Sequence, residues 1–131
     1  MPLKVRVSKN KFFILNLNNY RNTHHRVLSA AKRNYSDIFM SLDIPYRRYE
    51  KIRLHYKIYP ASKRKFDIMN VICIQDKFLC DAMVKRGMIP DDNTKHMPKM
   101  PSAVVMPVDR INPRIEVEIE SFGDVWRGRL K

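Results

Sequence analysis

The feature that most restricts the fold of this chain is a strand-like segment followed closely by a capped helix. Residues 51–59 (KIRLHYKIY) alternate strictly between apolar side chains and basic or histidine side chains, so the two kinds fall on opposite faces of a strand. Asp67 is a suitable N-cap for a helix that runs to Arg86 and stops at Gly87, and apolar residues recur on it at helical spacing. The two segments therefore predict a helix that packs on the apolar face of a sheet.

The rest of the chain predicts an α+β fold. The other expected elements are strands at 3–7 and 12–17, a polar asparagine-rich loop at 16–22, a helix at about 24–42 capped by Thr23, and a hairpin of strands at 102–108 and 114–122. The order strand–strand–helix–strand–helix–strand–strand is typical of a single α+β domain in which a mixed sheet packs against two main helices. We expect this domain to occupy residues 1–122, with a tail at 123–131.

The composition of the chain excludes several classes of protein. With 131 residues, 44% of them hydrophobic, the chain suits one domain with a packed core and not a disordered segment. It has neither a run of about 18 apolar residues nor the pattern of a signal peptide, so we expect a soluble, cytoplasmic protein with no membrane partner. Cys73 and Cys80 would lie about 10 Å apart on one helix, too far for a disulfide, so two reduced thiols are expected.

The charge of the chain is large and unevenly distributed. Lysine and arginine number 26 against 13 aspartates and glutamates, a formal charge of +13. Residues 1–66 carry 16 basic and 3 acidic side chains, whereas residues 67–92 carry 3 basic and 5 acidic ones. This surplus favours a polyanionic partner, most commonly nucleic acid, although a ribosome-like or membrane-surface protein could use charge alone. An acidic centre in a basic chain would repel phosphate unless a divalent cation lay between them, which favours a metal-dependent nuclease.

The central aspartates are the candidate metal ligands. Hydrolysis of a phosphodiester with Mg²⁺ requires carboxylate oxygens that converge from separate segments. Asp67 opens the long helix, Asp81 lies roughly three to four turns later, and Asp91 and Asp92 occupy the turn after the helix. Because that turn could fold back beside the helix, we expect Asp67 with Asp91 or Asp92 to bind the metal and Asp81 to be an auxiliary carboxylate.

The stretch from 63 to 93 resembles the core signature of RusA-type Holliday-junction resolvases, a family common in phages and prophages. The matching positions are the basic loop Lys63, Arg64 and Lys65, then Asp67, Asn70, Lys77, Asp81-Ala82-Met83, Gly87 and the pair Asp91-Asp92. The polar segment 18–21, the strand at 51–60 and the two closing strands extend the likeness to about residues 12–122. The chain departs from the signature at Met69, where the family has a second aspartate, and in a helix about four residues longer before Asp81.

The resemblance implies an endodeoxyribonuclease that resolves four-way DNA junctions by paired nicks in recombination and repair. It implies a homodimer with Mg²⁺, or Mn²⁺ as a substitute, at each of two sites, acting in the bacterial host of a phage or prophage. Lys77 would then stabilise the charge of the reacting phosphate. The residues expected to contact DNA are Lys63, Arg64, Lys65, Arg21, Asn70 and Arg53.

Each candidate residue also has a purely structural interpretation. Asp67 could serve only as the helix N-cap, worth about 1 kcal/mol, and the aspartate pair after the helix could be a solvated turn. Lys77 and Asp81 are spaced for a surface ion pair worth roughly tenths of a kcal/mol. Asp76 is the nearest carboxylate that could replace the missing aspartate, but helical spacing puts it on another flank, where solvation is the simpler interpretation.

Two other functions stay open. A thioether is a poor ligand for Mg²⁺, so Met69 favours a protein that keeps the fold and binds branched or duplex DNA without cutting it. An RNA-binding or partner-inhibiting phage protein would also account for the charge.

Overall fold

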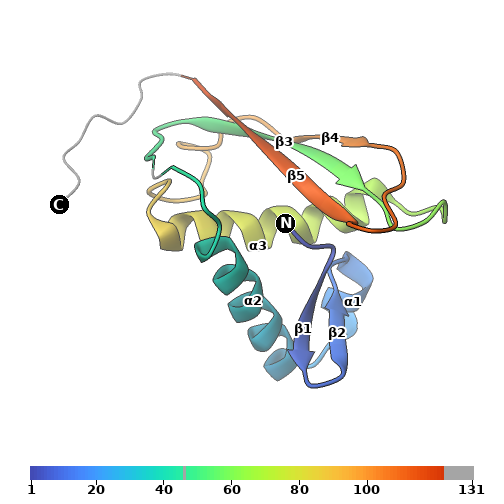
Figure 1. Cartoon of the computed structure of the whole chain (residues 1–131). Helices are drawn as coiled ribbons and strands as arrows, with labels where there is room; N and C mark the ends of the chain where they lie inside the picture. Colours follow the sequence, from blue (N-terminus) through green and yellow to red (C-terminus); the bar gives the residue numbers. More distant parts are fainter. Residues whose placement is uncertain (46, 123–131) are drawn as a thin grey trace.

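Three helices and five strands, divided between two sheets, make up the described part of the computed structural model, residues 1–45 and 47–122 (Figure 1). The elements are β1 (Lys4–Ser8), β2 (Lys11–Ile14), α1 (Leu17–Asn22), α2 (His25–Met40), β3 (Ile52–Tyr59), α3 (Ile68–Arg86), β4 (Ser102–Val105) and β5 (Arg114–Ser121). They confirm the predicted α+β class, while the expected tail at 123–131 lies outside the described residues. Within the described ranges, no helix combines the length and the apolar character needed to cross a membrane.

The main sheet has the order β4–β3–β5, with β4 parallel and β5 antiparallel to the central strand. The helix α3 covers one face of this sheet (Figure 1). The alternation predicted for β3 is confirmed, since Ile52, Leu54, Tyr56 and Ile58 are all buried and the residues between them are partly exposed. Burial of these side chains against α3 removes apolar area from water and so stabilises the two layers.

The helix α3 is the central layer of the molecule, because α2, α1 and the β1–β2 ribbon lie on its other side (Figure 1). The ring of Phe78 in α3 lies 6.2 Å from that of Phe13 in β2 and 5.6 Å from that of Tyr35 in α2. Gln75, fully buried in α3, accepts a hydrogen bond from the Tyr35 hydroxyl at 3.2 Å and donates one to the Pro2 carbonyl at 2.9 Å. Aromatic packing around Phe78 and the satisfied polar bridge of Gln75 therefore join α3 to α2 and to the amino-terminal segment.

The ends of α3 are those that the sequence predicts. Asp67 caps the first turn by accepting a hydrogen bond from the Met69 amide at 2.9 Å, and Gly87 ends the helix in the left-handed conformation at φ 82°. In the last turn, Nη1 of Arg86 donates to the Phe39 carbonyl at 2.8 Å. This bond ties the carboxyl end of α3 to that of α2.

Two predictions about the amino-terminal half are wrong. Residues 17–22 form the short helix α1 and not a loop, because Asn16 acts as an N-cap and accepts a hydrogen bond from the Asn19 amide at 2.8 Å. The helix α2 is capped by Nδ1 of His24, which accepts from the Arg26 amide, and not by Thr23. In both cases a polar side chain next to the expected position satisfies the exposed amides of the first turn.

The hairpin expected from the last two strands is also wrong. The strands β4 and β5 flank β3 on opposite sides, and β4 follows β3 in parallel after the crossover helix α3. The β1–β2 pair likewise forms a sheet of its own and does not join a single mixed sheet. Alternation predicts that a strand exists, but its partner depends on long-range packing.

Candidate nucleic-acid interface

A cleft of ≈ 470 Å³ opens where the amino end of α3 meets the ends of β2 and β3. Its polar wall consists of Asn16, Asn18, Ser62, Arg64, Lys65, Asp67 and Asn70. Apolar side chains, among them Ile14, Ile58 and Phe66, line the rest. The cleft therefore brings together four of the predicted site residues, two from the basic loop and two from the start of α3.

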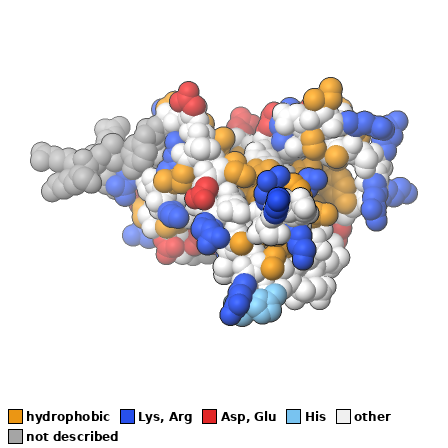
Figure 2. All heavy atoms as spheres, turned by 60° about the horizontal axis from the view of Figure 1, so that its bottom comes forward, with side chains coloured by type: hydrophobic (Ala, Val, Ile, Leu, Met, Phe, Trp, Pro, Cys, Tyr) orange, Lys and Arg blue, Asp and Glu red, His pale blue; other side chains and the backbone are white. Residues whose placement is uncertain are grey.

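The connection between β3 and α3 carries the basic residues to the surface. Lys63, Arg64 and Lys65 are all exposed there. A second cleft of ≈ 560 Å³ is lined by the same three residues and by residues 105–108 after β4. Figure 2 shows Lys and Arg side chains gathered most densely at the end of the molecule opposite the grey residues. Two concave surfaces that share one cationic loop suit a phosphodiester backbone.

Asp67 lies both at the cap of α3 and on the wall of the cleft. Its Oδ1 accepts the hydrogen bond from the Met69 amide, and the side chain is otherwise exposed. A carboxylate can accept several hydrogen bonds or a cation at once, so capping and ligand binding are compatible. Asn70 lies about one turn further along the helix and lines the same wall.

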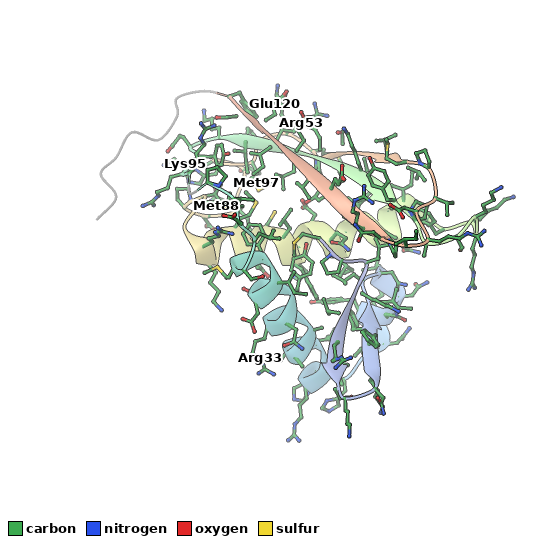
Figure 3. All side chains as sticks on the ribbon, viewed as in Figure 1. Arg33, Arg53, Met88, Lys95, Met97 and Glu120 are labelled. Atoms are coloured by element: carbon green, nitrogen blue, oxygen red, sulfur yellow. The ribbon has the colours of Figure 1, made fainter. Side chains whose placement is uncertain are left out.

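The other predicted carboxylates lie far from Asp67. Asp81 comes fourteen residues later in α3, which corresponds to about 21 Å along a helix axis. The segment after the helix stays at that distant end, because the His96 carbonyl accepts a hydrogen bond from the amide of Ile52, the first residue of β3, at 2.9 Å. Figure 3 labels Met88, Lys95 and Met97 of this segment beside the carboxyl end of α3.

The expectation that Asp67 shares a metal ion with Asp91 or Asp92 of the same chain is therefore wrong. Mg²⁺ is bound by several oxygen ligands in octahedral geometry. Asp67 is the carboxylate that lines the cleft. In the part of the chain that the structure describes, no group of three or more His, Cys, Asp or Glu side chains is arranged to hold a metal ion. The described carboxylates of one chain thus do not converge on a site for Mg²⁺.

Asp91 and Asp92 form a hydrogen-bonded turn. The Asp92 amide donates to Oδ1 of Asp91 at 2.8 Å, and the Asn93 side chain donates to its Oδ2 at 3.1 Å. Partial burial raises the pKa of Asp92, and the hydrogen bond with Asp91 and the negative charge of Asp81 raise it further. Asp92 and Asp81 are therefore near enough to repel each other, at the end of α3 remote from the cleft.

Asp76 is bonded to the sheet. Its Oδ1 accepts a hydrogen bond from the Tyr56 hydroxyl at 2.6 Å, and Sγ of Cys80 lies 3.7 Å from the same oxygen. Burial raises the pKa of both Tyr56 and Cys80, and the negative charge of Asp76 raises each further. Because its carboxylate is directed at β3, Asp76 does not replace the aspartate that is missing at Met69.

Lys77 and Asp81 form no ion pair with each other among the described residues. The Lys77 ammonium lies 6.0 Å from the centre of the Tyr20 ring in α1. Asp81 lines a separate cleft of ≈ 220 Å³ between α2 and α3, together with basic residues of both helices. Neither residue lines the cleft that contains Asp67.

The outer face of the main sheet is not a continuous basic surface. Arg53 lies directly opposite Glu120, and the next outward residues of β3, His55 and Lys57, are also opposite glutamates of β5. Nε of Arg53 donates to the Met100 carbonyl at 2.8 Å, and Figure 3 shows Arg53 and Glu120 on the side of the sheet away from α3. Arg53 therefore lies apart from the cleft. Arg21 is exposed on α1, the helix that begins at the cleft.

Comparison with known proteins finds no matching family model and no matching curated sequence.

Two residues of the cleft, Asn16 and Asn18, are not singled out as site residues by the sequence. The signal that could have found them is the run of asparagines at 16–22, because amide side chains are suited to the polar wall of a binding cleft.

Proposed function

We propose that this chain binds the backbone of branched DNA and acts as an Mg²⁺-dependent endonuclease that resolves four-way junctions by paired nicks. The observation that carries the proposal is the meeting of Asp67 and Asn70 with Arg64 and Lys65 in one cleft. Guanidinium and ammonium groups neutralise phosphates, and a carboxylate beside them is the type of group that holds a dication against a phosphodiester.

The proposed enzyme is a homodimer in which each active site is shared between two copies. Asp67 lies about 21 Å along the helix axis from Asp81. Two copies related by a two-fold axis, with their α3 helices antiparallel, would bring Asp67 of one copy to Asp81 and Asp92 of the other. Mg²⁺ bound there would polarise the phosphate and lower the pKa of the attacking water. Two sites related by symmetry would match the two equivalent strands of a junction.

Cleavage of a synthetic four-way junction tests this proposal. We expect nicks with Mg²⁺ or Mn²⁺, none with Ca²⁺ or EDTA, and none from the variants Asp67→Asn or Asp92→Asn alone. Shared sites predict that mixing these two inactive variants restores nicking of one strand, because each heterodimer contains one intact site. The matched control mixes Asp67→Asn with the double variant, which leaves no intact site. Cleavage by Asp67→Asn alone, or two dimeric variants that do not complement, contradicts the shared site.

The second candidate is a protein that binds junctions without cutting them. It is favoured by Met69, a residue that is 54% exposed at the start of α3 and carries a thioether where the resemblance implies a carboxylate. Such a protein would bind the junction but produce no nick at any concentration of a divalent cation. The variant Met69→Asp separates the two candidates further, because a gain of nicking shows that the cleft accommodates a second carboxylate. Equal affinity for single-stranded RNA at the same salt concentration would favour an RNA-binding protein instead.

A further inference from the structure

The outer face of the β1–β2 ribbon combines cations with exposed apolar side chains. The side chains that point inward from the ribbon, such as Val5, are buried. On the outer face the two strands pair so that Lys4 lies directly opposite Ile14 and Arg6 directly opposite Phe12. Phe12 and Ile14 are 49% and 54% exposed. Because the ribbon projects away from the main sheet (Figure 1), this face is accessible to a large partner.

Two cations flank the ring of Phe12. The Lys4 ammonium lies 4.8 Å and the Arg6 guanidinium 5.5 Å from the centre of the ring. Neither cation forms an ion pair with another described residue. The first 36 residues contain no aspartate or glutamate, so the ribbon, with Lys9 exposed at its turn, carries charge of one sign only. The ribbon therefore attracts a polyanion and offers it an aromatic ring.

The outer face of the ribbon continues from the cleft that contains Asp67. Ile14 lines that cleft, and Phe12 lies two residues earlier on the same face of β2, about 7 Å away along the strand. The side-chain amide of Asn34 in α2 donates a hydrogen bond to the Arg6 carbonyl, which fixes the ribbon to the rest of the molecule. A strand of DNA that leaves the cleft can therefore pass over Phe12 without a movement of the ribbon.

We propose that the ribbon binds unpaired DNA beside the branch of a junction, with one base stacked on Phe12 and the neighbouring phosphates bound by Lys4 and Arg6. This inference rests on the proposed binding of branched DNA and names the part of that DNA which the ribbon recognises. Stacking of a base on an aromatic side chain is stronger than a cation–π contact at an exposed site. An incoming base therefore displaces the two cations from the ring, and they bind the phosphates on either side of it.

Photochemical cross-linking tests the stacked base directly. The probe is a branched DNA whose unpaired arm carries 5-iodouracil, irradiated with the protein in EDTA so that no strand is cut. We expect a cross-link to Phe12, located by mass spectrometry of the peptides, because the excited base reacts with an aromatic ring stacked on it. Phe12→Tyr should keep the cross-link at this position and Phe12→Leu should lose it. Cross-links at other residues alone overturn the proposal.

Affinity and its salt dependence separate the stacking from the charge. Phe12→Leu should weaken binding of the same DNA about fivefold or more but leave the slope of log K against log salt unchanged, because it removes no charge. Lys4→Ala with Arg6→Ala should lower that slope by about 1.4, the value for two phosphate contacts with a single strand. Met40→Ala, which truncates a similarly exposed apolar residue at the far end of α2, is the matched control and should change neither quantity.

The outcomes distinguish the role of the ribbon from the proposed nuclease activity. If Phe12→Leu binds and cuts a junction as the wild type does, the ribbon proposal is overturned and the nuclease proposal stands. If the wild type makes no nick but Phe12→Leu still lowers the affinity for branched DNA, the nuclease proposal fails and the ribbon proposal stands. An RNA of the same sequence that binds much more tightly than the DNA overturns the assignment of DNA to the ribbon.

Discussion

The Asp67 carboxylate stands at the first turn of a helix and on the wall of a cleft. Its Oδ1 accepts the Met69 amide at 2.9 Å, which is the bond that starts α3. Its charge, beside Arg64 and Lys65, is the feature that the proposed chemistry needs. The two roles depend on different properties of the side chain, a hydrogen-bond acceptor in one case and a negative charge in the other.

The two roles of Asp67 can be separated by two substitutions. Asp67→Ala removes the cap and should lower the free energy of unfolding by about 1 kcal/mol, whereas Asp67→Asn keeps an acceptor and should lower it by much less. Urea denaturation of both variants measures the difference. Both variants should lose junction cleavage. Equal stability of the Ala and Asn variants would contradict the importance of the capping bond.

The two cysteines should differ strongly in reactivity. Cys73 is exposed and Cys80 is buried against Asp76. Burial raises the pKa of Cys80, and the charges of Asp76 and Asp92 raise it further, so at pH 8 its thiol stays protonated in the folded state. We expect an aromatic disulfide reagent to titrate one thiol in the native protein and two in denaturant, and none in native Cys73→Ser. If both thiols of the native protein reacted rapidly with the reagent, this assignment would be contradicted.

The raised pKa of Cys80 also predicts how the free energy of unfolding changes at alkaline pH. In the unfolded chain the thiol ionises in its ordinary range, near pH 8.5, while the folded chain keeps the proton to higher pH. The unfolded state is therefore favoured as the pH rises above that range, and the free energy of unfolding should fall. Cys80→Ala should be less stable overall but should show a shallower fall, which denaturation at a series of pH values measures.

At the scale of elements, α3 determines both the layers and the distances between candidate groups. It runs through the middle of the molecule with the sheet on one side and α2 with the β1–β2 ribbon on the other (Figure 1). Its 19 residues correspond to about 28 Å. The same length that lets one helix cover the sheet also keeps the carboxylates at its two ends apart.

Gly87 should be the most sensitive position at the end of α3. Its φ of 82° lies in the left-handed region, where a side chain with a Cβ atom is disfavoured. Gly87→Ala should lower the free energy of unfolding by about 1 kcal/mol or more. Gly87→Asn, which tolerates this conformation better, should lower it by less. Thermal unfolding of both variants checks the order, and an Ala variant as stable as the wild type would contradict it.

The sequence predicts those elements whose signals are local. The strict alternation of β3 and the Asp67 and Gly87 ends of α3 are confirmed, because each depends on residues within one segment. The pairing of β4 with β3 depends on how α3 crosses the sheet, which no local pattern contains. The expectation that Asp67 and Asp92 of one chain bind the same metal ion was wrong for a related reason. The direction of the chain after α3 is set by long-range hydrogen bonds, such as the one from the Ile52 amide to the His96 carbonyl.

At the scale of the whole molecule, the loop between β3 and α3 and the outer face of the main sheet differ in their balance of charge. Lys63, Arg64 and Lys65 project from the loop beside the cleft, while Lys57 on the outer sheet face lies opposite Glu116. Counterion release from DNA should therefore depend on the loop much more than on the sheet.

The salt dependence of DNA binding measures this asymmetry. The double variant Arg64→Ala with Lys65→Ala should bind a junction more weakly and reduce the slope of log K against log salt by about 2, roughly one for each lost phosphate contact. Lys57→Ala with Arg53→Ala removes the same charge and should leave the slope nearly unchanged. Equal reductions by the two pairs would show that the sheet face also contacts DNA.

The balance of charge on the outer sheet face has a practical consequence for handling the protein on solid supports. On mica or a sulfonated resin, the molecule should adsorb through its cationic loop and present the glutamate row of β5 to the liquid. A fluorophore or spin label attached at Glu118 would then remain accessible in the adsorbed state, whereas one attached at Lys65 would be pressed against the support.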